Sequence, residues 1–179
     1  MTENTKNWRS DIYDVLREQG VRQVCHVPDA GHAELIRNCE ADNEMTVVSL
    51  TTEEDGVGLC CGAWLGGERG VLLMQSSGVG NTINALAMPN ACRIPFVTIV
   101  SMRGEWGEFV PWQVPMGQAT PAVFEAMGVV VLRANHPDEV RETVNAAIKM
   151  AYDSGRQVAV LLSQRLIGTK DFRAKERKL

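Results

Sequence analysis

Residues 71–81 read Val-Leu-Leu-Met-Gln-Ser-Ser-Gly-Val-Gly-Asn. The first four are apolar on consecutive positions, which is typical of a short strand covered on both faces of a sheet. The polar and glycine-rich residues that follow predict a tight turn at the carboxyl end of that strand. Parallel strands of this kind need a crossover between them, so this stretch indicates an α/β protein with a parallel sheet.

Five further runs have the same apolar, β-branched character, and most are followed by a turn and a helical pattern. They are residues 23–27, 46–50, 96–100, 129–132 and 158–162. Apolar residues at helical spacing predict a first helix around Trp8 to Leu16 and a last helix from Pro137 to a stop at Gly155. We therefore predict a doubly wound, six-stranded and mostly parallel sheet with helices on both faces.

Composition limits the classes of function. The chain has 179 residues, of which 45% are hydrophobic and 22% charged, as in a globular domain and unlike a disordered or fibrous chain. Its net charge of -4 offers no attraction to nucleic acid or to an anionic membrane. We expect one domain over residues 1–168, followed by a basic, solvated tail over 169–179.

Targeting and redox signals are weak in this sequence. The N-terminal residues lack the apolar core of a signal peptide, and no apolar run reaches the roughly 20 residues that a membrane span needs. We therefore expect a cytoplasmic protein. The five cysteines form no Cys-x-x-Cys pair, so we expect reduced, mostly buried thiols and no metal ligands from this chain.

Polar residues follow five of the six predicted strands. Ligands of open α/β sheets bind beyond the carboxyl ends of the strands, so these residues are candidates for a site. The clusters are Pro28–His32, Thr51–Asp55, Gln75–Asn81, Ser101–Glu105 and Ser163–Arg165. The glycine-rich cluster lacks the third glycine of a dinucleotide fingerprint, where Ile83 stands, and the Gly-Lys-Ser/Thr of a P-loop. Gly78 and Gly80 either admit a flat ligand or let the next helix pack closely.

Three acids, Glu53, Glu54 and Asp55, open the helix after the second strand. Acids are favoured in a first helical turn by capping and by the helix dipole, so in isolation they do not indicate catalysis. Their position beside the glycine-rich turn changes the interpretation, because it brings a carboxylate to the ligand end of the sheet.

This combination resembles the pyrimidine-binding domain of thiamine-diphosphate-dependent decarboxylases, and in particular the alpha subunit of the sulfopyruvate and phosphonopyruvate decarboxylase family. The resemblance covers most of the chain. Three stretches carry it: Thr52-Glu53-Glu54-Asp55-Gly56-Val57-Gly58, Met74-Gln75-Ser76-Ser77-Gly78-Val79-Gly80-Asn81, and Arg103-Gly104-Glu105 with Met116-Gly117-Gln118-Ala119-Thr120-Pro121. Family members look like N-E-G-E-A-V-G, M-Q-N-S-G-L-G-N and R-G with M-G-R-A-T-P at these places.

The resemblance implies that Glu53, four residues before Val57, activates the cofactor, with Glu54 as its neighbour. A carboxyl bonded to N1′ of the aminopyrimidine makes that ring a base for the thiazolium C2 proton, and the cofactor then takes up electrons as a 2-oxo acid loses carbon dioxide. The residues implied to bind the cofactor are Glu53, Gln75, Ser76, Ser77, Gly78, Gly80 and Asn81. An alternative role for Asn81 is to cap the following helix.

The same resemblance implies what this chain lacks. The other half of the family's enzymes holds the diphosphate through Mg²⁺ with a G-D-G motif and a downstream Asn, and this sequence has no G-D-G. We therefore expect thiamine diphosphate and Mg²⁺ as cofactors, with metal and diphosphate held mainly by a diphosphate-binding (beta) subunit in a hetero-oligomer. Residues 101–121, which include Trp106, Phe109 and Trp112, have little periodicity and predict a loop at that junction or over the substrate.

Three residues are candidates for contact with a small 2-oxo acid: Asp29, His32 and Arg103. The Arg of M-G-R-A-T-P is Gln118 here, which leaves Arg103 to bind a sulfonate or phosphonate. In the alternative, Arg103 pairs with Glu105 or Glu108 and only shapes the loop. His32 is either a substrate contact or a surface residue of the following helix.

Three functions stay open at this stage. The first is a decarboxylase subunit acting on 3-sulfopyruvate or 3-phosphonopyruvate. The second is a carboligase or an aromatic 2-oxo acid decarboxylase of the same cofactor class, which analysis of products and substrates separates from the first. The third is a non-catalytic domain of the same fold, and the intact Glu53 beside an intact turn at 76–81 argues against it.

Overall fold

The structure is a computed structural model in which residues 7–169 are described. Six strands form one sheet in the order β2-β1-β3-β4-β6-β5, and every neighbouring pair is parallel. The strands are β1 (Val21–His26), β2 (Thr46–Ser49), β3 (Arg69–Gln75), β4 (Phe96–Ser101), β5 (Val130–Ala134) and β6 (Gln157–Leu162). The predicted six-stranded α/β sheet is confirmed, and it is parallel throughout.

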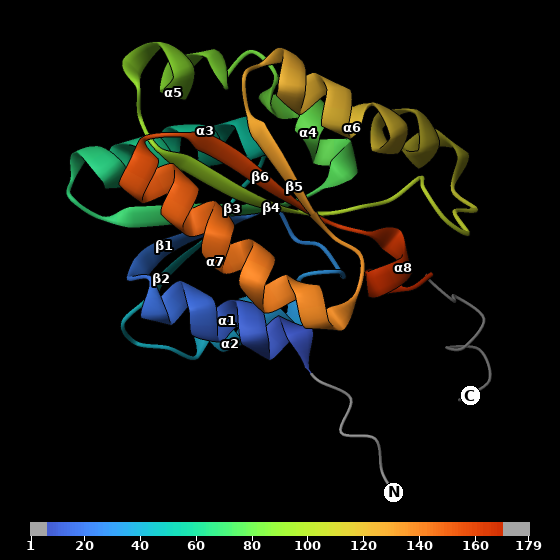
Figure 1. The fold of residues 1–179 in the computed structure, drawn as a ribbon, viewed down its shortest axis with the longest axis horizontal. Helices are drawn as coiled ribbons and strands as arrows, with labels where there is room; N and C mark the ends of the chain where they lie inside the picture. The colour runs from blue at the N-terminus through green and yellow to red at the C-terminus, as the bar shows by residue number, and fades with distance from the viewer. Residues whose placement is uncertain (1–6, 170–179) are drawn as a thin grey trace, which may run out of the picture.

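Helices cover both faces of the sheet (Figure 1). One face carries α1 (Trp8–Glu18), α2 (Ala33–Glu40) and α7 (Pro137–Ser154). The other carries α3 (Glu53–Leu65), α4 (Ser76–Thr82), α5 (Ala87–Cys92) and α6 (Val114–Ala126). The 3₁₀ turn η1 (Pro111–Gln113) and the short helix α8 (Gln164–Ile167) follow β4 and β6 beyond their carboxyl ends.

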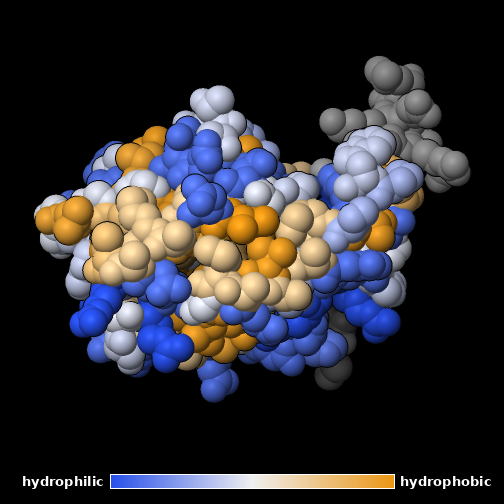
Figure 2. Space-filling view, turned by 90° about the horizontal axis from the view of Figure 1, so that it is seen from above, coloured by the Kyte–Doolittle hydropathy of each residue, from blue (hydrophilic) through white to orange (hydrophobic). Residues whose placement is uncertain are grey.

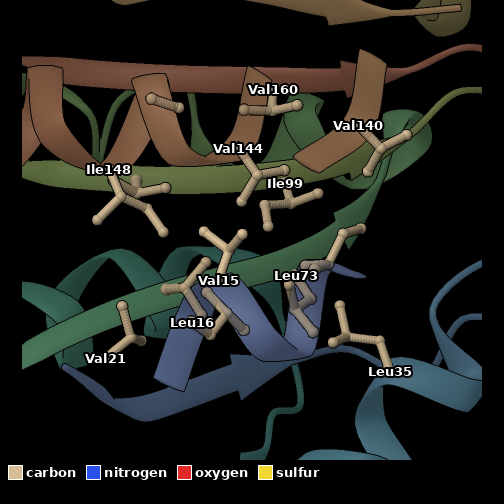
Figure 3. Close-up of a cluster of buried hydrophobic side chains, with 14 of the residues drawn as sticks. Val15, Leu16, Val21, Leu35, Leu73, Ile99, Val140, Val144, Ile148 and Val160 are labelled. Carbon is tan, nitrogen blue, oxygen red and sulfur yellow. The ribbon is translucent and has the colours of Figure 1, made fainter. Parts of the chain in front are cut away.

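The central strands supply a core to both faces because successive side chains of a strand point in opposite directions. Leu73 of β3 and Ile99 of β4 pack with Val15 of α1 and Val144 of α7 (Figure 3). Leu72, the neighbour of Leu73, belongs to the second core, under α3 and α6. Burial on both faces explains why the strands read as consecutive apolar runs.

The predicted first and last helices are confirmed. In α7, Pro137 lies in the first turn, and Glu139 accepts hydrogen bonds from the backbone N–H groups of Asn135 and His136. All five cysteines are free, and Cys92 alone among them is exposed. Within residues 7–169, no helix combines the length and apolarity that crossing a bilayer requires.

The predicted loop over 101–121 is wrong in its second part, which α6 occupies. Pro115 lies in the first turn of α6, where a backbone N–H would have no partner within the helix, so the N–H that proline lacks is not missed. Gly117 is required by packing, because a Cβ there would lie 1.8 Å from the carbonyl oxygen of Arg103. Pro115 therefore begins a helix, and Gly117 allows that helix to pack closely on the loop after β4. Between β4 and η1, residues 102–110 are irregular.

The direction of the strand order reverses between β1 and β3. From β1 the chain passes through α2 to β2 on one side, and from β3 it passes through α4 and α5 to β4 on the other. The two crossovers leave on opposite faces of the sheet, which opens a crevice beyond the carboxyl ends of the strands. The loop after β1 and the starts of α3 and α4 lie at this end of the sheet.

Candidate functional site

The carboxylate of Glu53 lies at the start of α3 and against α4. Glu53 is buried, with 7% of its surface exposed, and Nδ2 of Asn81 donates a hydrogen bond to its Oε2 at 2.8 Å. The other oxygen lies over Gly78, because a Cβ at Gly78 would be 2.0 Å from Oε1. Gly78 therefore makes room for the carboxylate itself.

Glu54, the next residue, is exposed. Consecutive residues of an α-helix point about 100° apart, so only one of the two acids can face α4. The structure brings Glu53, and not Glu54, to the glycine-rich segment. This placement supports the register in which Glu53 is the functional acid.

The glycine-rich segment is itself helical, because α4 begins directly after β3. Ser76 is fully buried, and its Oγ accepts a hydrogen bond from the backbone N–H of Arg103 at 3.0 Å. Ser77 is exposed and donates to Oε1 of Gln75 at 2.7 Å. Asn81 lies within α4 and bonds to Glu53, so the interpretation of Asn81 as the cap of the next helix is wrong.

A second polar cluster joins the ends of β1, β3 and β4. The Asp29 carboxylate accepts hydrogen bonds from Nε2 of Gln75 at 2.9 Å and from the hydroxyl of Ser101. Oε1 of Gln75 accepts in turn from Nε2 of Gln113, in η1, at 3.1 Å. Ser101 belongs to the predicted cluster Ser101–Glu105, although the sequence assigned it no specific role. Gln113 was not predicted, and no local signal distinguishes it.

Arg103 is buried in the loop after β4 and forms a bidentate ion pair with Glu108. Its Nε and Nη2 each lie 2.7 Å from a carboxylate oxygen. Gln164 completes the network: its Nε2 donates to Glu108 at 3.0 Å, and its Oε1 accepts from the N–H groups of Glu105 and Trp106. Arg103 therefore adopts the pairing with Glu108 that the sequence left as an alternative, and its charge is balanced within the loop.

Glu108 is held in its charged form. Burial alone would raise the pKa of Glu108, but the hydrogen bonds from Arg103 and from the backbone N–H groups of Val110 and Gly104 outweigh burial and lower that pKa to about 2. At neutral pH a full ion pair therefore holds residues 103–110 in place.

His32 is fully buried, which contradicts its interpretation as a surface residue. Its ring lies beside the backbone of Met74 and Ile99, beneath the strand ends. Burial lowers the pKa of His32, and the nearby Asp29 carboxylate opposes that effect only in part. The ring is therefore neutral at pH 7 and is separated from the outer surface.

A small cavity of about 130 Å³ lies next to the second polar cluster. Asp29, Ser101 and Arg103 line it, together with Arg9 of α1, the last residue of α8 and the two residues that follow α8. Two of the three predicted substrate residues therefore share a cavity, and His32 is not among its lining residues. Within residues 7–169, no three His, Cys, Asp or Glu side chains are grouped so that they could hold a metal ion.

An apolar band crosses the face formed by α4, α5 and α6 (Figure 2). Exposed apolar side chains on this face include Ile83, directly after α4, and Met88 of α5, and Trp112 of η1 is 78% exposed. Met116 of α6 lies against Gly80, next to the Glu53 site. The apolar face therefore begins at the candidate site.

The sequence of this chain matches a known cofactor-binding family over residues 6–108, described as thiamine pyrophosphate enzyme, N-terminal TPP binding domain. The chain therefore belongs to this family of thiamine-diphosphate enzymes. The buried Glu53 and the helix with Gly78 lie inside the matched residues. The resemblance seen in the sequence is confirmed.

Within this family the chain is similar to alpha subunits of sulfopyruvate decarboxylase. The subunit from Methanococcus maripaludis is 34% identical over 152 residues, which are 84% of this chain and 91% of the relative. The subunit from Methanocaldococcus jannaschii is 32% identical over 151 residues, 84% of this chain and 89% of the relative. Phosphonopyruvate decarboxylase from Streptomyces viridochromogenes is 35% identical over 100 residues, 55% of this chain and 25% of the relative.

The fold is similar to that of a solved 2-oxoglutarate:ferredoxin oxidoreductase from Magnetococcus marinus, with a TM-score of 0.71. The likeness covers 89% of this chain and 29% of that chain, at 13% identity. At this identity the likeness concerns the fold alone, and it agrees with the predicted α/β architecture.

Proposed function

We propose that this chain is the pyrimidine-binding subunit of a thiamine-diphosphate-dependent 2-oxo acid decarboxylase. The observation that carries the proposal is the buried Glu53 carboxylate, held by Asn81 at one oxygen and placed over Gly78 at the other. Residues 1–168 would form the cofactor-binding domain. The tail predicted at 169–179 lies outside the described residues, apart from Thr169.

The residues of this site fit an aminopyrimidine ring. Oε1 of Glu53 has no hydrogen-bond donor among residues 7–169, yet it is not one of the fully enclosed polar atoms there, so a ligand that brings a donor can reach it. When bound, thiamine diphosphate would supply the nucleophilic carbon and the electron sink for decarboxylation. Glu53 would hold a proton between Oε1 and N1′ of the ring.

The remaining cofactor residues would have unequal roles. Gly78 keeps a side chain of α4 away from the carboxylate, Gly80 lets Met116 of α6 approach α4, and Gln75 and Ser77 would form a polar rim of the cofactor site. Ser76 is buried against Arg103, so it would act by fixing the start of α4 and not by touching the cofactor.

We propose that the substrate is a small 2-oxo acid of the 3-sulfopyruvate or 3-phosphonopyruvate type, as the names of the relatives suggest. The cavity between Asp29 and Arg103 would receive it. Glu108 balances the charge of Arg103, so this subunit offers no free cation there. An anionic group of the substrate would instead meet hydrogen-bond donors and the dipole of the ion pair. His32 would act on the substrate only through the cluster above it.

The partner in this proposal is a diphosphate-binding beta subunit that also holds Mg²⁺. Relatives of this chain are named alpha subunits, and the sequence has no G-D-G motif, which supports a second subunit. The apolar face starts two residues after Asn81, at Ile83, so a subunit that completes the site would also cover that face. We place the assembled enzyme in the cytoplasm.

The test mixes the chain with a diphosphate-binding subunit, thiamine diphosphate and Mg²⁺, and compares Glu53→Gln with Glu54→Gln. We expect Glu53→Gln to assemble normally and to lose at least about 100-fold in kcat, since an amide cannot share an ionisable proton. Glu54→Gln should keep wild-type turnover because its side chain is exposed.

Reversed phenotypes would place the functional acid at Glu54, and two normal variants would exclude a catalytic domain. Substrate class is read from turnover of 3-sulfopyruvate, 3-phosphonopyruvate, pyruvate and phenylpyruvate by the same complex. Equal or faster turnover of the uncharged-tail acids would contradict the anionic assignment.

A further inference from the structure

Asn81 and Glu53 come from different helices, 28 residues apart, yet their side chains are in direct contact. A carboxylate can only accept hydrogen bonds, so Asn81 must turn its NH₂ group toward Glu53 and its amide oxygen away. The bond restrains Oε2, at 2.8 Å, and leaves Oε1 over Gly78 as the oxygen that can meet a ligand.

We propose that Asn81 is a positioning residue for Glu53, an inference that rests on the proposed function above. Asn81 decides which carboxylate oxygen faces the aminopyrimidine and restricts rotation about the last side-chain bond of Glu53. Sharing a proton with a ring nitrogen depends on distance and angle, and a misplacement of about 1 Å can cost on the order of 100-fold in rate. Asn81 acts through Glu53 and needs no contact with the cofactor.

The number of hydrogen bonds explains why this one contact matters. Glu108, in the same molecule, is held by two bonds from Arg103 and four more from Gln164 and backbone N–H groups. Glu53 is also buried, but within residues 7–169 its carboxylate accepts a single hydrogen bond and joins no salt bridge. Removal of the Asn81 amide therefore frees the Glu53 carboxylate, while Glu108 would stay restrained after the loss of any one donor.

A purely structural role for Asn81 is the competing explanation, since the same bond also joins α3 to α4. The two roles predict different measurements. A structural contact affects the free energy of unfolding and the affinity for the cofactor, whereas a positioning contact affects the activation of cofactor that is already bound.

The experiment compares Asn81→Ala and Asn81→Asp with Asn84→Ala, an exposed asparagine three residues further on. In the reconstituted two-subunit complex, we measure the rate at which the C2 proton of bound thiamine diphosphate exchanges with D₂O, and the Kd of the cofactor by calorimetry. Asn81→Ala should slow exchange about 10-fold to 100-fold at saturating cofactor while Kd changes by less than about threefold. Asn81→Asp should slow it further, because it sets a second carboxylate beside Glu53.

Asn84→Ala should match the wild type in both measurements. The positioning role would be overturned if Asn81→Ala, saturated with cofactor, exchanged the C2 proton at the wild-type rate. It would also be overturned if a higher Kd for the cofactor fully explained the slower exchange. A wild-type complex that does not accelerate exchange over free cofactor would instead refute the proposed function.

The contact itself is tested in the free chain, without any cofactor. The side-chain amide protons of Asn81 should shift in the NMR spectrum of Glu53→Gln and stay in place in Glu54→Gln. If Glu53→Gln leaves them unmoved, the two side chains are not in contact in solution and the inference fails whatever the complex does.

Discussion

Glu108→Gln removes one negative charge from the loop after β4 and keeps the size of the side chain. In the wild type, the Glu108 carboxylate accepts hydrogen bonds from Nε and Nη2 of Arg103, both at 2.7 Å, and from Nε2 of Gln164 at 3.0 Å. In the variant, an NH₂ group replaces one of these acceptors and faces a donor. The guanidinium of Arg103, whose side chain is 5% exposed, would then be buried without a counter-charge.

The loss of the Glu108 charge should cost several kcal/mol of stability. The pKa of Glu108 falls from 4.5 to about 2, and this shift corresponds to about 3 kcal/mol of preference for the charged form. Breaking a buried ion pair by removing one partner typically costs about 3–5 kcal/mol. A protein of this size is stable by about 5–15 kcal/mol, so Glu108→Gln should remove a large fraction of the free energy of unfolding.

Urea unfolding of the free chain at pH 7 measures this cost, and Glu105→Gln is the matched control. Glu105 lies in the same loop and pairs with Arg133, but their side chains are 18% and 35% exposed, so we expect a loss of less than about 1 kcal/mol. Equal losses in the two variants would refute the argument that burial makes the Arg103–Glu108 pair strong.

The same pair predicts an acid-dependent loss of stability. Because the pKa of Glu108 is lower in the folded chain, its contribution is complete above pH 4.5 and is lost as the pH falls from 4.5 toward 2. The wild type should therefore lose stability over this range more steeply than Glu108→Gln. Parallel curves would show that Glu108 is not the group responsible.

Three further predictions concern the site and its support. Gly78→Ala would place a Cβ 2.0 Å from Oε1 of Glu53, so the folded variant should lose most of its activity. Gly80→Ala would place a Cβ 3.3 Å from the sulfur of Met116 and should lose less. Turnover of the reconstituted complex measures both effects. Burial lowers the pKa of His32, so stability should fall as the pH drops below about 6.5, and His32→Leu should flatten the urea-unfolding profile between pH 7.5 and 5.5. Arg103→Ala should impair turnover of 3-sulfopyruvate and pyruvate alike, because the charge of Arg103 is paired with Glu108. A loss confined to 3-sulfopyruvate would contradict this prediction.

The fold could be predicted from the sequence because the central strands β3, β4 and β6 are covered on both faces. Double burial gives these strands long apolar runs, and this pattern is local enough to be read without a structure. The helix α6 escaped prediction for the opposite reason. Gly117 and Pro121 are residue types that usually indicate a loop. Gly117 is instead required because the carbonyl of Arg103 packs against it, and no local sequence pattern predicts that contact.

The candidate site was predictable only in part. Glu53 could be chosen because it opens a helix beside a glycine-rich segment and because Val57 fixes the family's register. Gln113 was not predicted, and Gln164 was predicted only as a member of the cluster Ser163–Arg165, because their partners lie 38 and 59 residues away and depend on how η1 and α8 pack. The alternative that placed His32 on the surface was wrong, because polar residues at helix starts usually face solvent, whereas this ring lies under the strand ends.

Residues 75–81 are the segment on which these contacts converge. Gln75 donates a hydrogen bond to Asp29, and Ser76 accepts one from the backbone N–H of Arg103. Gly78 lies under the Glu53 carboxylate, and Asn81 donates a hydrogen bond to it. Three different partners, Asp29, Arg103 and Glu53, therefore meet this segment, and the helix α4 sets the distances between the contacts. Ser76 and Asn81 belong to the same short helix, so we expect a displacement at Ser76 to move Asn81 as well and thereby to link the buried Arg103–Glu108 pair to the Glu53 carboxylate. In the proposed function, the loop after β4 would therefore support the placement of Glu53 in addition to lining the substrate cavity.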